Sequence, residues 1–221
     1  MSAIRAVLLD LYDTLAWSDW PVLRGLIEGR TGLSSRQLLD AFDATRAARS
    51  IGAYGSQEAD IRAVLSAAGL EPVDALVTEL AALIDGFLRN GVHLWEDSIP
   101  VMRALRGRRI RTAIVSNCDH GTRPVIDGLG LADEADAVVL SFEAGVAKPD
   151  PGIYLAALGA LGAGPEEAVF VDDQARYCDG AADLGMATYI VLREDAAPGE
   201  GVSQTGGHPM IRDLRTLLEL L

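Results

Sequence analysis

The stretch "AVLLDLYDTLAW", residues 6–17, decides the fold of this chain. Val7, Leu8 and Leu9 form a continuous apolar run that leads directly into Asp10. A short apolar run of this kind indicates a buried strand. A buried carboxylate is costly, so its place at the end of a strand suggests a chemical role. The bulky Tyr12, two residues later, limits the reactions in which Asp10 could take part.

The composition excludes several classes of partner. The 221 residues hold 19 Lys and Arg against 32 Asp and Glu, a formal net charge of −13. This balance disfavours nucleic acid and anionic membranes, which bind basic surfaces, but it does not exclude a local basic pocket for a small anion. Two cysteines, Cys118 and Cys178, indicate a reducing compartment. The first apolar run is too short for a signal peptide, and none approaches the ~20 residues of a membrane span. We expect a cytoplasmic monomer or homodimer.

After the first strand, the sequence up to about residue 91 shows helical patterns and no strand patterns. The sequence predicts helices over residues 21–29, 35–50, 57–68 and 72–90, with an apolar stripe at helical spacing along the last of them. We expect residues 17–91 to form a small all-helical domain inserted after the first strand.

From Trp95 onward, short apolar strands alternate with helices. Strands are expected over residues 112–116, 137–141, 168–171 and 187–192, and helices over 98–106, 123–129, 151–161 and 178–184. A loop over 193–208 and a closing helix over 210–221 complete the pattern. Continuous apolar strands that alternate with helices predict a doubly wound, Rossmann-like α/β core, with helices on both faces of a parallel sheet. Residues 1–16 and 92–221 would form this three-layer core.

Polar residues gather at the expected carboxyl ends of these strands, where open parallel sheets bind ligands. The set comprises Asp10, Ser116, Asn117, Lys148, Asp172 and Asp173. Taken singly, Ser116 and Asp172 could cap helices, and Lys148 could be an ordinary surface lysine. Their convergence on one end of the sheet indicates a functional site.

Four segments, in order, resemble the motifs of the haloacid dehalogenase superfamily of hydrolases: "DLYDTL", "IVSN", "SFEAGVAKPDPGIY" and "VFVDDQARYCDGAADLGM". The helical insertion resembles the helical-bundle cap domain of that superfamily, and the resemblance covers essentially the whole chain. It implies a hydrolase in which Asp10 is the nucleophile and forms a covalent aspartyl intermediate that water then hydrolyses.

The resemblance also implies roles for the other residues. Thr14 would hydrogen-bond around the nucleophile, and Ser116, with neighbouring backbone N–H groups, would hold the anionic oxygens of a small substrate. Lys148 would offset the crowded negative charge. Further candidates are Asn117 for substrate binding, and Asp10, the Tyr12 backbone carbonyl, Asp172 and Asp173 for holding Mg²⁺.

Tyr12 departs from the phosphatase branch, which usually has there a second Asp that protonates the leaving alkoxide. The L-2-haloacid dehalogenase branch typically has Tyr, since a halide leaves without a proton. Tyr154 resembles another tyrosine of that branch, although helix packing would also explain it. Arg46 and Arg49, three residues apart on an expected helix, would clamp a substrate carboxylate or belong to a solvated face.

The fourth motif favours the other branch. Dehalogenases place small neutral residues where Asp172 and Asp173 stand, and two extra carboxylates beside Asp10 imply a cation. Asp13, where the family usually has Gly, is either a displaced acid or a residue that tolerates a tight turn. Three hypotheses therefore stay open: Mg²⁺-dependent hydrolysis of a small phosphate ester, metal-independent dehalogenation of a 2-haloacid, and a catalytically impaired binding protein.

Overall fold

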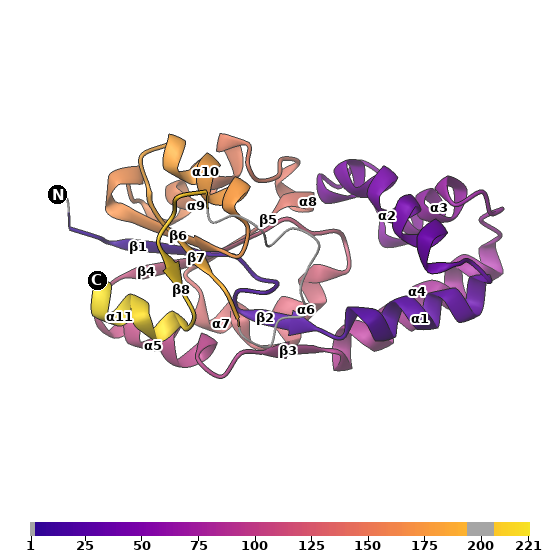
Figure 1. Ribbon diagram of the computed structural model, residues 1–221, viewed down its shortest axis with the longest axis horizontal. Helices are drawn as coiled ribbons and strands as arrows, with labels where there is room; N and C mark the ends of the chain where they lie inside the picture. The colour runs from indigo at the N-terminus through magenta and orange to yellow at the C-terminus, as the bar shows by residue number, and fades with distance from the viewer. Residues whose placement is uncertain (1–2, 194–205) are drawn as a thin grey trace.

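The computed structural model describes residues 3–193 and 206–221 (Figure 1). Its centre is a six-stranded sheet in the order β5-β4-β1-β6-β7-β8, in which every pair is parallel. The strands are β1 (Ala6–Leu9), β4 (Arg111–Ser116), β5 (Ala137–Leu140), β6 (Ala168–Asp172), β7 (Ala187–Val191) and β8 (Met210–Ile211). Most of the loop expected over residues 193–208 lies outside the described residues.

Helices cover both faces of the sheet because β1, its central strand, is apolar on both sides. Val7 and Leu9 join one core cluster with α5 (Ser98–Gly107) and α6 (Thr122–Gly128). Ala6 and Leu8 join another with α9 (Pro151–Leu161) and α10 (Ala175–Asp183). Figure 1 shows α9 and α10 on the opposite side of the sheet from α5 and α11. The predicted doubly wound α/β fold is therefore confirmed.

Shorter helical elements connect the strands. They are α7 (Leu131–Glu134), α8 (Ser141–Ala144), η1 (Pro165–Glu167), η2 (Leu214–Thr216) and α11 (Leu217–Leu220). Of these, α8 carries the chain from β5 toward the loop of Lys148, which lies at the carboxyl edge of the sheet. These connections bring several segments that are distant in sequence to one end of the sheet.

The predicted insertion contains four helices, which lie between residues 18 and 92: α1 (Trp20–Thr31), α2 (Ser35–Ser50), α3 (Gln57–Ala67) and α4 (Asp74–Asn90). They enclose an apolar cluster of their own, which includes Leu38, Leu65 and Leu80. A capping box between Ser34 and Gln37 starts α2. Figure 1 shows these helices at one end of the molecule, with α2 near α8.

A short antiparallel pair, β2 (Ala16–Ser18) with β3 (Val92–Leu94), joins the insertion to the sheet. The sequence did not predict it, because three-residue strands show too little alternation to be recognised. The pair lies at the predicted boundaries between residues 16 and 17 and between 91 and 92. The division into two domains at these positions stays a prediction.

The helix predicted over residues 210–221 is wrong in its first half. Met210 and Ile211 form β8, which pairs with β7 at Ile190 and Val191 and extends the sheet. The Asp213 side chain then accepts a hydrogen bond from the backbone N–H of Arg215 and starts η2. The apolar residues of this segment satisfy a helical pattern, but the open edge of β7 offers the backbone hydrogen bonds that make Met210–Ile211 a strand.

A buried ion pair fastens the loop after β1 to the end of β7. Arg193 Nη1 lies 2.7 Å from Asp97 Oδ2, and Arg193 Nη2 donates a 2.6 Å hydrogen bond to the carbonyl oxygen of Thr14. The Arg193 and Asp97 side chains are only 5% and 2% exposed. The backbone N–H of Leu214 also donates to Asp97 Oδ2, at 2.7 Å. The carboxylate therefore holds three segments together.

Arg193→Ala is expected to lower the free energy of unfolding by about 3–5 kcal/mol at pH 7, since it leaves a buried carboxylate unpaired. Burial raises the pKa of Asp97, but the hydrogen bonds from Arg193 and Leu214 outweigh it and hold that pKa below its usual range. The native pair thus contributes fully above the unfolded pKa of about 3.9 and loses its contribution as pH falls through the folded value. In the variant, acid neutralises the unpaired carboxyl group.

The destabilisation by Arg193→Ala should therefore shrink as pH falls from 7 toward about 4. Urea unfolding at both pH values measures it. Arg36→Ala is the matched control, because the Arg36–Asp40 ion pair is exposed and should contribute under about 1 kcal/mol. Equal destabilisation by Arg193→Ala at both pH values would contradict the role given to Asp97.

Candidate functional site

Four of the predicted polar residues, Asp10, Ser116, Asn117 and Lys148, line a cleft of about 650 Å³ between the carboxyl edge of the sheet and α2, and Asp172 and Asp173 lie beside Asp10. Asp10 follows β1, Ser116 ends β4, Asp172 ends β6, and Lys148 comes from the loop after α8. Lys148 Nζ lies 2.5 Å from Asp10 Oδ1 and 2.6 Å from Asp172 Oδ2. The Lys148 side chain is 1% exposed, so this ammonium group bridges two carboxylates away from water.

Asn117 positions Lys148. Its side-chain nitrogen Nδ2 donates a 2.8 Å hydrogen bond to the carbonyl oxygen of Lys148, and its Oδ1 accepts one of 2.7 Å from the Lys148 backbone N–H. The rings of Tyr177 and Phe170 lie 4.9 and 5.5 Å from Lys148 Nζ. The two rings hold the ammonium group through cation–π contacts. The Asn117 amide, which the sequence suggested for substrate binding, is occupied by its hydrogen bonds to the Lys148 backbone.

Negative charge exceeds positive charge at this edge of the sheet. Carboxylate oxygens of Asp10, Asp172 and Asp173 lie within 4.8 Å of one another, and Lys148 faces them. Burial, opposed by Lys148 and aided by Asp172, raises the pKa of Asp10 to about 7. Burial and the neighbouring carboxylates raise the pKa of Asp173 to about 9. A divalent cation held by these oxygens would offset that excess, so the residues present fit Mg²⁺.

Two buried hydroxyl groups near Asp10 lack hydrogen-bond partners within the described structure. They are Thr14 Oγ1, four residues after Asp10, and Ser116 Oγ, which lines the cleft. Buried polar groups almost always have partners, so an unpaired hydroxyl group beside a cleft indicates a missing ligand. The Ser116 hydroxyl group is therefore suited to contact a bound anion, whereas Thr14 is fully buried and does not line the cleft.

Tyr12 and Asp13 both line the cleft. The Tyr12 ring packs against the apolar core, and burial raises the pKa of its phenol well above the usual range. Asp13 has a φ of +60°, a left-handed conformation that Asp tolerates better than most residues do. Burial raises the pKa of the Asp13 carboxyl group. The site therefore has a carboxyl group one residue after the phenol, at the position where the family usually has Gly.

The two arginines predicted to form one clamp lie apart. Arg46 lines the cleft and pairs with Asp43, at 2.7 Å. Arg49 turns away from it: its Nη1 lies 2.7 Å from Asp119 Oδ2, and its Nη2 donates to the carbonyl oxygen of Phe42. Residues three apart on a helix differ in direction by about 60°, and Asp119 captures the second guanidinium group.

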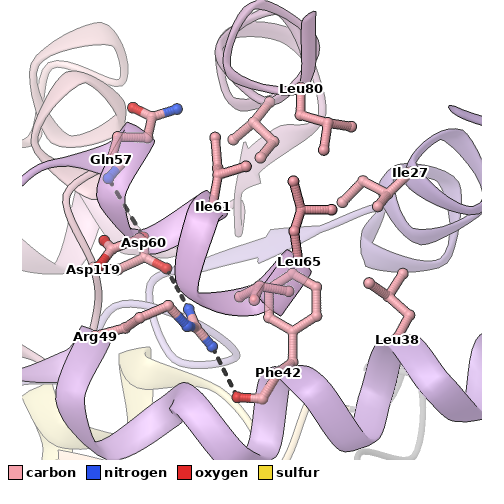
Figure 2. Close-up of a pocket in the computed structure, with 13 residues that line it drawn as sticks. Ile27, Leu38, Phe42, Arg49, Gln57, Asp60, Ile61, Leu65, Leu80 and Asp119 are labelled. Atoms are coloured by element: carbon pink, nitrogen blue, oxygen red, sulfur yellow. Dashed lines mark hydrogen bonds and ion pairs between the residues drawn. The ribbon is translucent and has the colours of Figure 1, made fainter. Parts of the chain in front are cut away.

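Arg49 borders a separate apolar cavity of about 60 Å³ inside the helical insertion (Figure 2). Leu38, Ile61 and Leu65 form part of its wall, and the Arg49–Asp119 pair lies at one side. A second contact ties the insertion to the same loop, since Asp60 Oδ2 lies 2.7 Å from His120 Nδ1. Both contacts end on residues that lie two and three positions after Asn117.

Tyr154 does not reach the cleft. It is fully buried, donates a 2.7 Å hydrogen bond to the carbonyl oxygen of Tyr177, and packs edge-on against Phe170. The sequence missed Arg176, which lines the cleft and donates to the Tyr177 hydroxyl group at 2.8 Å. Its place three residues after Asp173, at the start of α10, was the available signal.

Comparisons with known proteins show the family of the chain. The model of the haloacid dehalogenase-like hydrolase family matches residues 4–185. Phosphatase MT3486 of Mycobacterium tuberculosis is 31% identical over 129 residues, which are 58% of this chain and 55% of that protein. Glyceraldehyde 3-phosphate phosphatase of Methanopyrus kandleri is 29% identical over 201 residues, 86% of this chain and 84% of that one.

A solved L-2-haloacid dehalogenase from Xanthobacter autotrophicus superposes with a TM-score of 0.69 at 22% identity, over 98% of both chains. At that identity the likeness shows the shared fold. The chain spans about half the length of the first curated relatives it matches, 55% and 49%. Within the described residues, the structure has no helix long and apolar enough to cross a membrane.

Proposed function

Because the chain belongs to the haloacid dehalogenase-like hydrolases, we propose that it hydrolyses a small phosphate ester in a Mg²⁺-dependent reaction, with Asp10 as nucleophile. The observation that carries this proposal is the group of three carboxylates, Asp10, Asp172 and Asp173, against one buried Lys148. Without a cation, this group would place uncompensated negative charge where an anionic substrate must bind. The phosphatases among the relatives also support it.

Asp10, Asp172, Asp173 and the Tyr12 backbone carbonyl would hold the Mg²⁺, which when bound offsets the charge of the carboxylates and of the phosphate oxygens. Asp10 would attack phosphorus and form an aspartyl-phosphate, and water would then hydrolyse it. The unpaired Ser116 hydroxyl group would hold a phosphate oxygen.

The remaining residues would support the nucleophile. Lys148 favours the ionised form of Asp10, since its ammonium group lowers the pKa that burial raises. Asp13 would protonate the leaving oxygen in place of the acid that Tyr12 replaces. Residues 17–91 would act as the cap that selects the substrate, with Arg46 in contact with its anionic or polar end.

Dehalogenation is the second candidate, because Tyr12 occupies a position where the dehalogenase branch has Tyr. The solved dehalogenase of the same fold is compatible with it. It would leave Asp172 and Asp173 without a chemical role and their charge without a partner beyond Lys148.

A substrate panel with and without Mg²⁺ separates the candidates. With p-nitrophenyl phosphate and small alkyl phosphates, we expect phosphate release in Mg²⁺ and a loss of at least about 100-fold in EDTA, as removal of an electrostatic catalyst implies. Chloride release from 2-chloropropionate should stay at background. Asp173→Asn should show the same loss at limiting Mg²⁺. Phosphate release that EDTA does not slow, or chloride release, would refute the phosphatase proposal.

A further inference from the structure

A second polar pocket, of about 480 Å³, lies at the opposite end of the sheet. Its lining residues are Arg5, Arg106, Arg109, Ile110, Arg111 and Asp136. Arg5 directly precedes β1, and Arg111 is the first residue of β4 and pairs in register with Ala6. Asp10 and Ser116 follow five residues later on the same strands. At about 3.3 Å per residue, the pocket lies roughly 16 Å from the cleft.

Positive charge is concentrated in this pocket although the chain as a whole is acidic, with a net charge of −13. Among residues 3–193 and 206–221, no carboxylate forms an ion pair with Arg109 or Arg111. Arg5 pairs with Glu167 at 3.1 Å, with the two side chains 53% and 31% exposed, and an exposed pair of this kind exchanges readily for another anion. Arg106 is held more firmly, because it lies 3.5 Å from the buried Glu134 carboxylate and donates to the backbone carbonyls of Asp133 and Glu134.

Helix stabilisation does not account for the cluster. Cations are favourable at the carboxyl end of a helix, which explains Arg106 in the last turn of α5. Arg5 directly precedes β1 and Arg111 begins β4, however, where no helix dipole acts. They face the same pocket from a different layer of the fold.

Arg109 adds an independent observation, because its φ is +64°. The Ile110 N–H donates to the Leu105 carbonyl and the Arg109 N–H to the Arg106 carbonyl, as in the Schellman motif that ends helices. Glycine is the usual residue at this position, and a side chain there is unfavourable. The chain nevertheless places a guanidinium group at the pocket from this strained position.

We propose that this pocket binds a small molecule that carries a diphosphate or triphosphate group. Guanidinium groups recognise phosphate through paired, charge-assisted hydrogen bonds, and those of Arg5, Arg109 and Arg111 match several phosphate oxygens. The volume falls in the range of small-molecule sites. An extended polyanion such as nucleic acid is disfavoured, since the net charge of −13 of the whole chain repels it. This site is independent of the proposed function, because it uses none of the cleft residues.

Calorimetric titration of the full chain with inorganic tripolyphosphate in EDTA tests the proposal. EDTA removes cations from the cleft, so its three carboxylates repel the probe. We expect one equivalent to bind. Arg109→Ser/Arg111→Ser should weaken binding by at least about 100-fold, given roughly tenfold for each charged hydrogen-bonding group removed. Its phosphatase activity should be unchanged, which would also show that it folds.

The control variant is Arg36→Ser/Arg89→Ser, which removes the same charge from exposed positions on the helical insertion. It should bind tripolyphosphate as the native chain does. Equal weakening in both double variants would indicate general charge attraction and overturn the proposal. Absence of binding to the native chain, or native affinity in Arg109→Ser/Arg111→Ser, would overturn it as well.

Discussion

Asp10→Asn should lower the turnover of phosphate esters by at least about 10⁴-fold, a loss typical of removing a nucleophile. Asparagine keeps the shape of the side chain and an oxygen that accepts the hydrogen bond from Lys148 Nζ, but it has no carboxylate to attack phosphorus. Phosphate release and rapid-quench mass spectrometry measure the result. The native chain should show a phosphorylated peptide that contains Asp10, and the variant should not.

The fold should survive this change. Burial raises the pKa of Asp10 to about 7, so above its unfolded pKa of about 3.9 the folded state disfavours the charged form. A neutral asparagine removes that penalty, and unfolding at pH 7 should need no less urea than in the native chain. Turnover within tenfold of the native rate would refute Asp10 as nucleophile.

Asp13→Asn is the matched control, since it removes another carboxyl group that lines the same cleft. As the proposed proton donor, Asp13 should matter most when the leaving alkoxide is poor. Alkyl phosphates should then slow by about 10²–10⁴-fold, whereas p-nitrophenyl phosphate should slow far less. Equal slowing of both esters would assign Asp13 a positioning role instead of proton transfer.

The sequence predicted the catalytic edge of the sheet because its signals are local. An apolar run that ends in Asp10 and another that ends in Asp172 specify parallel strands, and parallel strands bring their carboxyl ends together. The helices of the insertion could also be predicted from the sequence, since long helical patterns with Ser34 as a cap need no tertiary information. The roles of these residues were inferred from family resemblance and stay predictions.

The rest depended on contacts between distant segments. Arg49 and Arg46 share a helix and a spacing, yet only the position of Asp119 decides that Arg49 leaves the cleft. The sequence pattern predicts a helix at Met210 and Ile211, and only the open edge of β7 in the folded chain makes them a strand. Arg193 shows no pattern at all, and its burial against Asp97 follows only from the folded chain.

Lys148→Met should abolish detectable turnover and, without Mg²⁺, lower the free energy of unfolding by about 3–5 kcal/mol at pH 7. Methionine resembles lysine in length but removes the ammonium group that lies 2.5 Å from Asp10 and 2.6 Å from Asp172. Asp172 is fully buried, so its carboxylate would lose a partner that no water replaces. Urea unfolding in EDTA measures the loss.

Two further variants show that the loss comes from unpaired charge. Lys148→Met/Asp172→Asn should regain part of the stability, because it neutralises the more deeply buried carboxylate, but it should not regain activity. Lys148→Arg keeps the charge and should be less destabilised than Lys148→Met. If Lys148→Met were as stable as the native chain at pH 7, the carboxylates would not depend on this ammonium group.

The effect of pH on Lys148→Met gives a further test. Without the ammonium group, the pKa of Asp10 should rise further, so the penalty exists above that value and disappears as acid protonates the carboxyl group. Mg²⁺ should also reduce the penalty, since a cation on Asp10, Asp172 and Asp173 offsets the same charge. If Mg²⁺ stabilised the variant more than the native chain, Lys148 and the cation would both offset the negative charge of these carboxylates. No stabilisation of either chain by Mg²⁺ would argue against a cation at these carboxylates.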